Sequence, residues 1–396
     1  MGFALFDEST RRFDLLCSLK MACSRNRELD NFVNTNSFSV VELEKALTTK
    51  LREVLASVPW LDAVISRFPT ISDKGFDLLV KVKPPTGMSR ELWVQFKADP
   101  RPSQFPYAFV AKEEDPQSVL VFAAPLITPN MAQTVQENGW SWFDLAGNCH
   151  LNIPNVLLIE RKGNAPVHKS PRPSANLSTP ESARVIRALL VPEHVGKTWT
   201  QREMQLHCEP NVSLGLVNKV VRHLTDEAYV ELVKEGFRIR DPFKLLTAWR
   251  DAYRFDRHTQ HRYFTLKKGS DLQQALGSLE SITGGHAAYC AFTAADFQAP
   301  HVRQAKTWLF VGSEWEDAFA SALEAKRVDT GENMTVLLPE DPGVFYLQES
   351  EGNKLACTNP VQTYVDLWHC GGRGQEAAEA LLEQKLKPEW KLRIPA

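Results

Sequence analysis

The chain has 396 residues and an almost balanced charge, with 46 Lys and Arg against 48 Asp and Glu. Hydrophobic residues make up 43% and charged residues 24% of the sequence, which is typical of globular proteins and excludes collagen-like, coiled-coil and wholly disordered chains. This length predicts two or three domains, each with its own core. No stretch approaches ~18 uninterrupted apolar residues, so we expect neither a membrane-spanning segment nor a membrane partner.

The N-terminus and the cysteines indicate a cytosolic protein. Met1–Asp7 contains neither the basic nor the apolar region of a secretory signal, and Phe6 stands where a myristoylation signal has Ser or Thr. Seven cysteines are scattered along the chain without a C-x-x-C pair, which argues against a disulfide framework and a zinc ribbon. We therefore expect reduced cysteines and a cytoplasmic location.

The sequence of residues 1–162 predicts an α/β domain, because apolar residues at helical spacing alternate with short apolar runs. The run at 119–124 is apolar throughout, which is typical of a strand buried on both faces. In chain order we expect a helix at 39–58, strands at 76–82, 91–97 and 119–124, a helix at 130–137 and an apolar segment at 142–153.

Three residues of the first two strands form a candidate metal centre. Asp77 opens one strand, and Gln95 and Lys97 share a face of the next because residues i and i+2 of a strand point the same way. A metal-dependent nuclease needs oxygen ligands for Mg²⁺ and a Lys near the attacking water. The neutral amide of Gln95 is a poorer magnesium ligand than a carboxylate. Alternative carboxylates are those of Glu42, Glu53 and Asp99.

The order of helix, strands, helix and strand, with Asp77 and Gln95-x-Lys97, resembles the core of PD-(D/E)xK nucleases. The resemblance implies a restriction-endonuclease-like fold in which these three residues are catalytic and Asp77 is a metal ligand. It also implies Mg²⁺ as the cofactor where the site is active. Because Gln95 stands in place of the acidic residue, we expect no cofactor and no cleavage.

A proline-rich linker and a shift in charge mark the next boundary. Residues 163–180 contain four prolines and no apolar periodicity, so we place a linker at 163–179. Residues 159–250 hold 15 Lys and Arg against 10 Asp and Glu, whereas residues 255–396 hold 14 against 19. This segregation predicts that the middle segment contacts a polyanion and that the acidic end faces away from it.

Residues 180–254 have the pattern of three short helices followed by a hairpin, which is typical of a winged helix-turn-helix domain. Ser178-Thr179-Pro180-Glu181 combines a hydroxyl cap, a proline and an acid as at many helix starts. The expected elements are helices that begin at Pro180 and Thr200, a third helix from about Ser213 to Ala228, and strands at 229–233 and 237–240.

Polar and basic residues of the third helix fall opposite its apolar stripe. They are of the types that reach base edges and phosphates from a helix in the major groove. Two arginines of the hairpin would lie along the backbone or in the minor groove. The predicted DNA-binding residues are Ser213, Asn218, Lys219, Arg222, Arg238 and Arg240. The alternative is a solvated helix face in a module that binds protein.

Residues 255–396 alternate apolar runs with helical stretches, which predicts a second α/β domain. Two glycine-rich segments, Gly284-Gly285 and Gly371–Gly374, lack the Lys and the spacing of a phosphate loop. The region shows no catalytic constellation. Because its acidic charge turns it away from DNA, we expect it to bind another protein partner or a second copy of the chain.

Two parts of the sequence resemble AbiEi-type antitoxins of type IV toxin–antitoxin and abortive-infection systems. Val212–Leu224, Arg240-Asp241-Pro242 and Leu245–Trp249 resemble their winged-helix segment, and Asn359–Leu367 and Gly371–Glu379 resemble their terminal signature. The resemblance covers about residues 178–385. It implies that the winged helix binds DNA and that the C-terminal domain has a nucleotidyltransferase-like topology without its active site.

These observations predict an α/β multidomain protein with a restriction-endonuclease-like domain, a central winged helix and a C-terminal antitoxin-like α/β domain. We expect a sequence-specific DNA-binding transcriptional regulator of the antitoxin type from a bacterial defence or mobile-element system. The alternative is a Mg²⁺-dependent endonuclease directed to its site by the winged helix. Double-stranded DNA is the expected partner, and a homodimer is the expected assembly because two-fold dimers read pseudo-palindromic operators.

Overall fold

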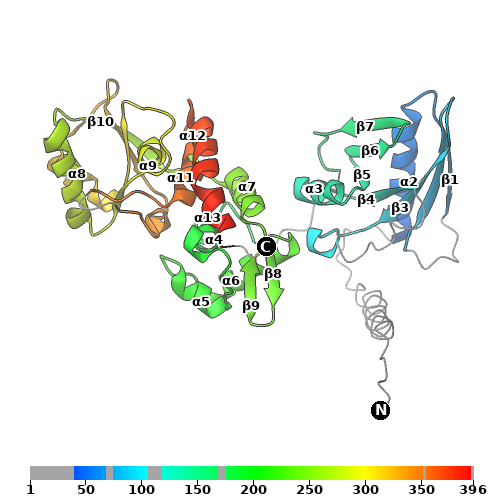
Figure 1. Cartoon of the computed structure of the whole chain (residues 1–396), viewed down its shortest axis with the longest axis horizontal. Helices are drawn as coiled ribbons and strands as arrows, with labels where there is room; N and C mark the ends of the chain where they lie inside the picture. The colour runs from blue at the N-terminus through cyan, green and yellow to red at the C-terminus, as the bar shows by residue number, and fades with distance from the viewer. Residues whose placement is uncertain (1–39, 68–74, 106–117, 168–174, 351–353, 394–396) are drawn as a thin grey trace, which may run out of the picture. The chain divides into compact units, whose positions relative to one another are not determined.

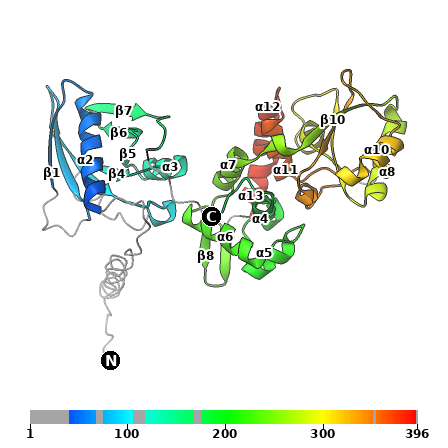
Figure 2. The same cartoon turned by 180° about the vertical axis from the view of Figure 1, so that it is seen from behind.

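The computed structural model describes residues 40–67, 75–105, 118–167, 175–350 and 354–393, and they form two compact units. The first unit contains most of the described residues up to 167. The second contains those from Ala175 onward together with residues 101–105 and 129–134. Each unit combines helices with strands, as Figure 1 and Figure 2 show, so the expectation of an α/β multidomain protein is confirmed at this level. Within the described part of the chain, no helix has the length and apolar composition that crossing a membrane requires.

One seven-stranded sheet forms the first unit, and its strands lie side by side in chain order. The first three strands are antiparallel, β3, β4 and β5 are parallel, and the last three are again antiparallel. The strands are β1 (Asp62–Arg67), β2 (Leu78–Lys83), β3 (Arg90–Phe96), β4 (Ser118–Ala124), β5 (Ser141–Asp144), β6 (Cys149–Ile153) and β7 (Leu157–Arg161).

Helix α2 (Val40–Ala56) covers one face of this sheet (Figure 2). Its Leu47 and Leu51 are fully buried in one hydrophobic core with Val80 of β2 and Val121 of β4. Helix α3 (Pro129–Glu137) connects β4 to β5, and the short 3₁₀ helix η1 (Pro102–Gln104) follows β3. The strands expected at 76–82, 91–97 and 119–124 correspond to β2, β3 and β4, and they position the candidate metal centre.

The second unit begins with three helices and a two-stranded hairpin. Helix α4 starts with a Thr179 cap, and α5 starts with a capping box in which Thr200 and Glu203 bond each other's backbone N–H groups. The elements are α4 (Pro180–Leu190), the 3₁₀ helix η3 (Pro192–His194), α5 (Gln201–His207), α6 (Leu214–Asp226), β8 (Val230–Val233) and β9 (Gly236–Ile239).

The hairpin is anchored by the backbone of Trp199, which exchanges N–H···O bonds of 2.8 and 2.9 Å with Phe237. Only a glycine fits beside this contact. Gly236 has φ of 152°, and a Cβ on it would lie 2.1 Å from the carbonyl oxygen of Trp199. The turn between the two hairpin strands, Lys234-Glu235-Gly236, therefore also carries the close approach that fixes the hairpin to the segment before α5.

The rest of the second unit is a five-stranded mixed sheet with helices around it, in the strand order β11-β12-β14-β10-β13. Its strands are β10 (Thr259–Phe264), β11 (Ala287–Tyr289), β12 (Thr307–Val311), β13 (Lys326–Arg327) and β14 (Met334–Leu338). Its helices are α7 (Pro242–Ala252), η4 (Phe255–Arg257), α8 (Gly269–Thr283), α9 (Ala291–Gln298), η5 (Ser313–Trp315), α10 (Glu316–Ala322), η6 (Pro342–Phe345), α11 (Pro360–His369), α12 (Gly374–Leu381), the π-helix η7 (Leu382–Leu386) and α13 (Lys387–Lys391).

One hydrophobic core joins the three-helix segment to the C-terminal helices. Fully buried Trp199 and Trp249 belong to the same cluster as Tyr364 of α11. The indole N–H of Trp390 in α13 also donates to the carbonyl of Leu190 at the end of α4, at 2.9 Å. Helix α7 thus shares its core with α11, and the end of α4 is hydrogen-bonded to α13, although α11 and α13 lie far along the chain.

Candidate nucleic-acid interface

Helix α6 has one buried and one exposed face. Ser213 caps its first turn by accepting the N–H of Leu216 at 3.2 Å. The buried face is apolar and carries Val217, Val220, Val221 and Leu224. The opposite face exposes Asn218, Lys219 and Arg222. The structure therefore brings four of the sequence-predicted residues together on one capped helix, as the helical spacing indicated.

The polar residues on this face differ in whether their side chains already contact other residues of the protein. The Nδ2 group of Asn218 donates to Oε1 of Gln201, at the start of α5, at 3.2 Å. Among the described residues, neither Lys219 nor Arg222 forms an ion pair with an acid, and both side chains are exposed. Burial lowers the pKa of His223 on the flank of the same helix, which keeps this imidazole neutral. The positive charge of the exposed face therefore comes from Lys219 and Arg222.

The two predicted arginines of the hairpin have different surroundings. Nε of Arg238 lies 2.5 Å from Oε1 of Glu231, its cross-strand neighbour in the ladder of β8 and β9. Arg240 follows β9, is exposed, and forms no ion pair with the described residues. A phosphate would have to compete with Glu231 for Arg238, whereas Arg240 is available to it.

Further basic residues near this face were not predicted. Arg202 is exposed in the first turn of α5, and Lys234 is exposed in the hairpin turn. The ammonium of Lys197 lies 3.7 Å from the ring centroid of Trp199. Arg202 lies in the first turn of α5, directly after the capped start of the helix. Side chains in a first turn are often exposed, so the sequence could have indicated that Arg202 lies on the surface. Lys197 gave no such signal, because its contact with Trp199 depends on the hairpin.

The candidate metal centre lies at the edge of the sheet where β2 begins and its antiparallel neighbour β3 ends. The backbone N–H of Asp77 donates to the carbonyl of Val94 at 2.9 Å, and Oδ2 of Asp77 accepts the N–H of Phe96 at 2.7 Å. Gln95 is 9% exposed, and its Nε2 donates to the carbonyl of Gly75 at 3.0 Å. Lys97 directly follows β3 and is exposed. The sheet thus brings Asp77 beside the Gln95–Lys97 segment.

These groups do not fit a catalytic magnesium centre. The carboxylate of Asp77 already accepts a backbone N–H, and the Gln95 amide brings no charge. Oε1 of Gln95 is buried without a hydrogen-bond partner among the described residues, so one neutral oxygen is available to a cation. The described part of the chain contains no group of three or more His, Cys, Asp or Glu residues placed to hold a metal ion. Mg²⁺ bound through protein oxygens relies on carboxylates.

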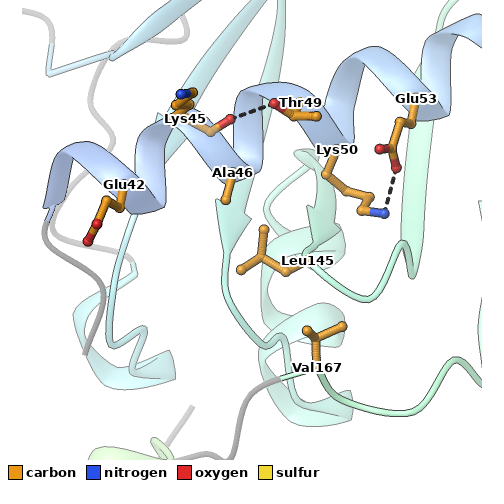
Figure 3. Close-up of a pocket in the computed structure, with 8 residues that line it drawn as sticks. All are labelled: Glu42, Lys45, Ala46, Thr49, Lys50, Glu53, Leu145 and Val167. Atoms are coloured by element: carbon orange, nitrogen blue, oxygen red, sulfur yellow. Dashed lines mark hydrogen bonds and ion pairs between the residues drawn. The ribbon is translucent and has the colours of Figure 1, made fainter. Parts of the chain in front are cut away.

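The alternative acids of helix α2 lie along a different groove, shown in Figure 3. Glu42 and Glu53 line it together with Leu145, whereas Asp77 and Gln95 do not. Glu53 accepts a hydrogen bond of 2.6 Å from the ammonium of Lys50. The groove is thus a mixed-charge surface of α2, and it does not complete the ligand set of Asp77.

Comparison with known proteins gives a match for part of the second unit. Residues 238–387 match the family described as a transcriptional regulator, the AbiEi antitoxin of a type IV toxin–antitoxin system. The matched segment runs from the second hairpin strand, β9, to the start of α13 and covers less than half of the chain. No curated protein and no solved structure matches this chain.

Proposed function

We propose that residues 180–254 form a winged helix-turn-helix that binds double-stranded DNA, and that the chain is an antitoxin-type transcriptional regulator. The observation that carries this proposal is the exposed face of α6, where Asn218, Lys219 and Arg222 project from a capped helix whose other face is buried. The match of residues 238–387 to the AbiEi family supports the regulator class, and it covers the end of β9 and all of α7 in this segment.

In the proposed complex, α6 enters the major groove with its N-terminal half foremost. Asn218 would contact a base edge, and Lys219 and Arg222 would contact phosphates or a guanine. Arg240 of the hairpin would contact the backbone beside the groove. Phosphate contacts by Lys and Arg release condensed counterions, so affinity should fall steeply with salt.

The first unit is proposed to bind DNA or a partner without cleaving. Its helix, antiparallel strands and parallel strands follow the order of PD-(D/E)xK nucleases, which supports a nuclease-like origin. The weak ligand set at Asp77 and Gln95 is the reason to propose no magnesium cofactor and no cleavage. The rival endonuclease function would require metal-dependent nicking that depends on Asp77 and Lys97.

The acidic C-terminal region is proposed to contact a toxin, another protein partner or a second protomer. Its net negative charge would be repelled by the DNA backbone within a Debye length of ~8–10 Å. A homodimer would place two α6 helices on the two halves of a pseudo-palindromic operator.

The full-length protein tests the proposal directly. Duplexes that bind it are selected from a random-sequence pool, and affinity is then measured by fluorescence anisotropy at several salt concentrations. We expect an enriched sequence that binds at least ~10³-fold more tightly than random DNA, with log affinity falling linearly with log salt. The absence of both enrichment and salt-dependent binding would contradict the proposal.

A further inference from the structure

A small pocket in the second unit lies among helix α4, the end of α7, His258 and the 3₁₀ helix η6. Arg187 and Trp249 line it, with Ala183 on one wall and Arg254 near the chain that leaves α7. Its volume of about 30 Å³ admits roughly two water-sized groups. The pocket shares no residue with the exposed face of α6.

Two of the side chains that line this pocket carry a buried donor with no acceptor. Arg187 is 2% exposed, and among the described residues its Nη1 group has no hydrogen-bond partner. Trp249 is fully buried, and its Nε1 group has no partner in the described part of the chain either. Buried donors are rarely left unpaired in proteins, so two at one pocket indicate a group that accepts from both.

The guanidinium of Arg187 is held in place from its other side. Its Nε and Nη2 groups donate to Oε1 of Gln362 at 2.9 and 2.7 Å, and its Cζ lies 5.5 Å from the ring centroid of Trp249. Nη1 lies on the side of η6, because a Cβ on Gly343 would come within 3.0 Å of it. The unpaired donor therefore cannot turn to another partner without breaking the Gln362 bonds.

The charges around the pocket favour an anion. Its two acids are already paired, Asp341 with Arg184 and Glu340 with Arg257 at 3.5 Å. Burial lowers the pKa of His258 to about 4, so this imidazole is neutral at pH 7. The cation of Arg187 remains: Asp341, the acid that acts on it most strongly, is paired with Arg184, and the buried Asp366 is reached through Gln362.

We propose that this pocket binds the carboxylate group of a small ligand, with Arg187 Nη1 and Trp249 Nε1 donating to its two oxygens. Two donors and a space for about two water-sized groups match the two oxygens of a carboxylate better than the larger phosphate. Arg254 also lines the pocket, but it pairs with Asp256 at 2.7 Å, so the attraction for the anion comes from Arg187. This site is independent of the proposed DNA contacts.

The test uses the full-length protein, with acetate and inorganic phosphate as separate probes and chloride at matched ionic strength as the control. Binding is followed by calorimetry and by the shift of the thermal unfolding midpoint. We expect saturable binding of acetate that exceeds binding of phosphate. Trp249→Phe keeps an aromatic ring but replaces the indole and its N–H donor, so it should weaken acetate binding roughly tenfold.

Trp308→Phe is the matched control, because Nε1 of Trp308 is also buried and unpaired among the described residues but does not line the pocket. It should bind acetate as the wild type does. Ala183→Leu should fill the pocket and abolish binding.

The proposal is overturned if acetate has no saturable effect beyond chloride, if phosphate binds more tightly than acetate, or if Trp249→Phe and Ala183→Leu bind acetate like the wild type. A loss equal to that of Trp249→Phe in the Trp308→Phe control would also overturn it. None of these results depends on DNA binding, so the two proposals are tested separately.

Discussion

Arg187 of α4 donates two hydrogen bonds to Oε1 of Gln362 in α11, a residue 175 positions further along the chain. The Nε2 group of Gln362 in turn donates to the hydroxyl of Tyr253 at 2.9 Å and to Oδ1 of Asp366 at 2.8 Å. Gln362 therefore connects the first helix of the proposed DNA-binding segment, through a buried polar network, to the helix that lies in the family-matched region. We expect the two parts to unfold together.

Replacing Gln362 with Leu should destabilise the second unit by about 3–5 kcal/mol, because it leaves the buried cation of Arg187 without its acceptor. Urea unfolding of the full-length protein, followed by tryptophan fluorescence, measures the change. Gln304→Leu at an exposed position is the control, and it should alter stability by less than about 0.5 kcal/mol. Similar unfolding curves for the two variants would show that the Gln362 bonds contribute nothing.

Lys219→Ala should weaken binding to the selected duplex and lower the slope of log affinity against log salt by about 0.9, because one phosphate contact is lost. Arg222→Ala should cost about 1–3 kcal/mol of binding free energy if it contacts a guanine, with relaxed specificity at one position. Both side chains point away from the core, so stability should not change.

The matched controls for these two variants are Lys268→Ala and Arg303→Ala, which remove exposed cations elsewhere in the second unit. They should leave the affinity and the salt slope at the wild-type values. If Lys219→Ala and Arg222→Ala behave like these controls in fluorescence anisotropy, α6 does not dock in the groove.

The elements of the proposed DNA-binding segment could be predicted from the sequence because their signals are local. Thr179, Thr200 and Ser213 each accept a backbone N–H at the predicted helix start, and the stripe of α6 lies on its buried face. Capping and periodicity depend only on residues a few positions apart. The sequence of this segment alone is therefore sufficient to predict where its helices begin and which face of α6 is buried.

What the sequence could not predict depends on distant partners. Trp249 of α7 shares a core with Tyr364, which is 115 residues further along the chain, and no local pattern in the sequence pairs them. Glu231 and Arg238 are both visible in the hairpin pattern, yet their ion pair depends on the register of β8 and β9. Strand β1 was not predicted because most of its side chains, such as Val64, are exposed and give no alternating pattern.

The first unit should not cleave DNA. With supercoiled DNA and Mg²⁺ or Mn²⁺, we expect no nicking above a buffer control, because the Gln95 amide adds no charge to a metal bound at Asp77. Gel electrophoresis of the plasmid measures the result. Metal-dependent nicking that disappears in both Asp77→Ala and Lys97→Ala would instead establish the endonuclease function, provided that both variants remain folded by circular dichroism.

Asp366 should make stability depend on pH. Burial raises the pKa of this carboxyl to about 7, whereas an Asp in an unfolded chain titrates near ~3.9. Between these values the folded protein keeps a proton that the unfolded chain has released. The stabilisation from this carboxyl is therefore complete below about pH 4 and is lost as the pH rises to 7. Oδ2 of Asp366, buried without a partner among the described residues, is a suitable place for the proton.

Asp366→Asn removes this titration while keeping an oxygen that accepts from Tyr253 and Gln362. Relative to the variant, the wild type should lose up to about 4 kcal/mol of stability between pH 4 and pH 7. His258, whose pKa is lowered to about 4 by burial, titrates with the opposite sign in both proteins and cancels in the comparison. Urea unfolding at several pH values gives the difference, and parallel pH profiles would contradict the assignment.

Glu231→Gln should strengthen binding to the selected duplex. The change removes the acid that pairs with Arg238, and both side chains are about 40% exposed, at 39% and 41%, so the released guanidinium can reach a phosphate. Removing a negative charge near the DNA also strengthens binding, because it reduces the repulsion of the phosphates. We expect a gain of a few-fold in affinity and a salt slope that is steeper by up to about 0.9. Anisotropy titrations at several salt concentrations measure both quantities.

Arg238→Ala and Arg240→Ala separate these two effects. In the wild type Arg238 is occupied by Glu231, so Arg238→Ala should change affinity less than Arg240→Ala does. In the double variant Glu231→Gln, Arg238→Ala the gain in salt slope should disappear, because no released cation remains, while the gain from the lost acid should persist. If Glu231→Gln leaves both affinity and slope unchanged while Lys219→Ala lowers them, α6 contacts the DNA and the hairpin lies outside the interface.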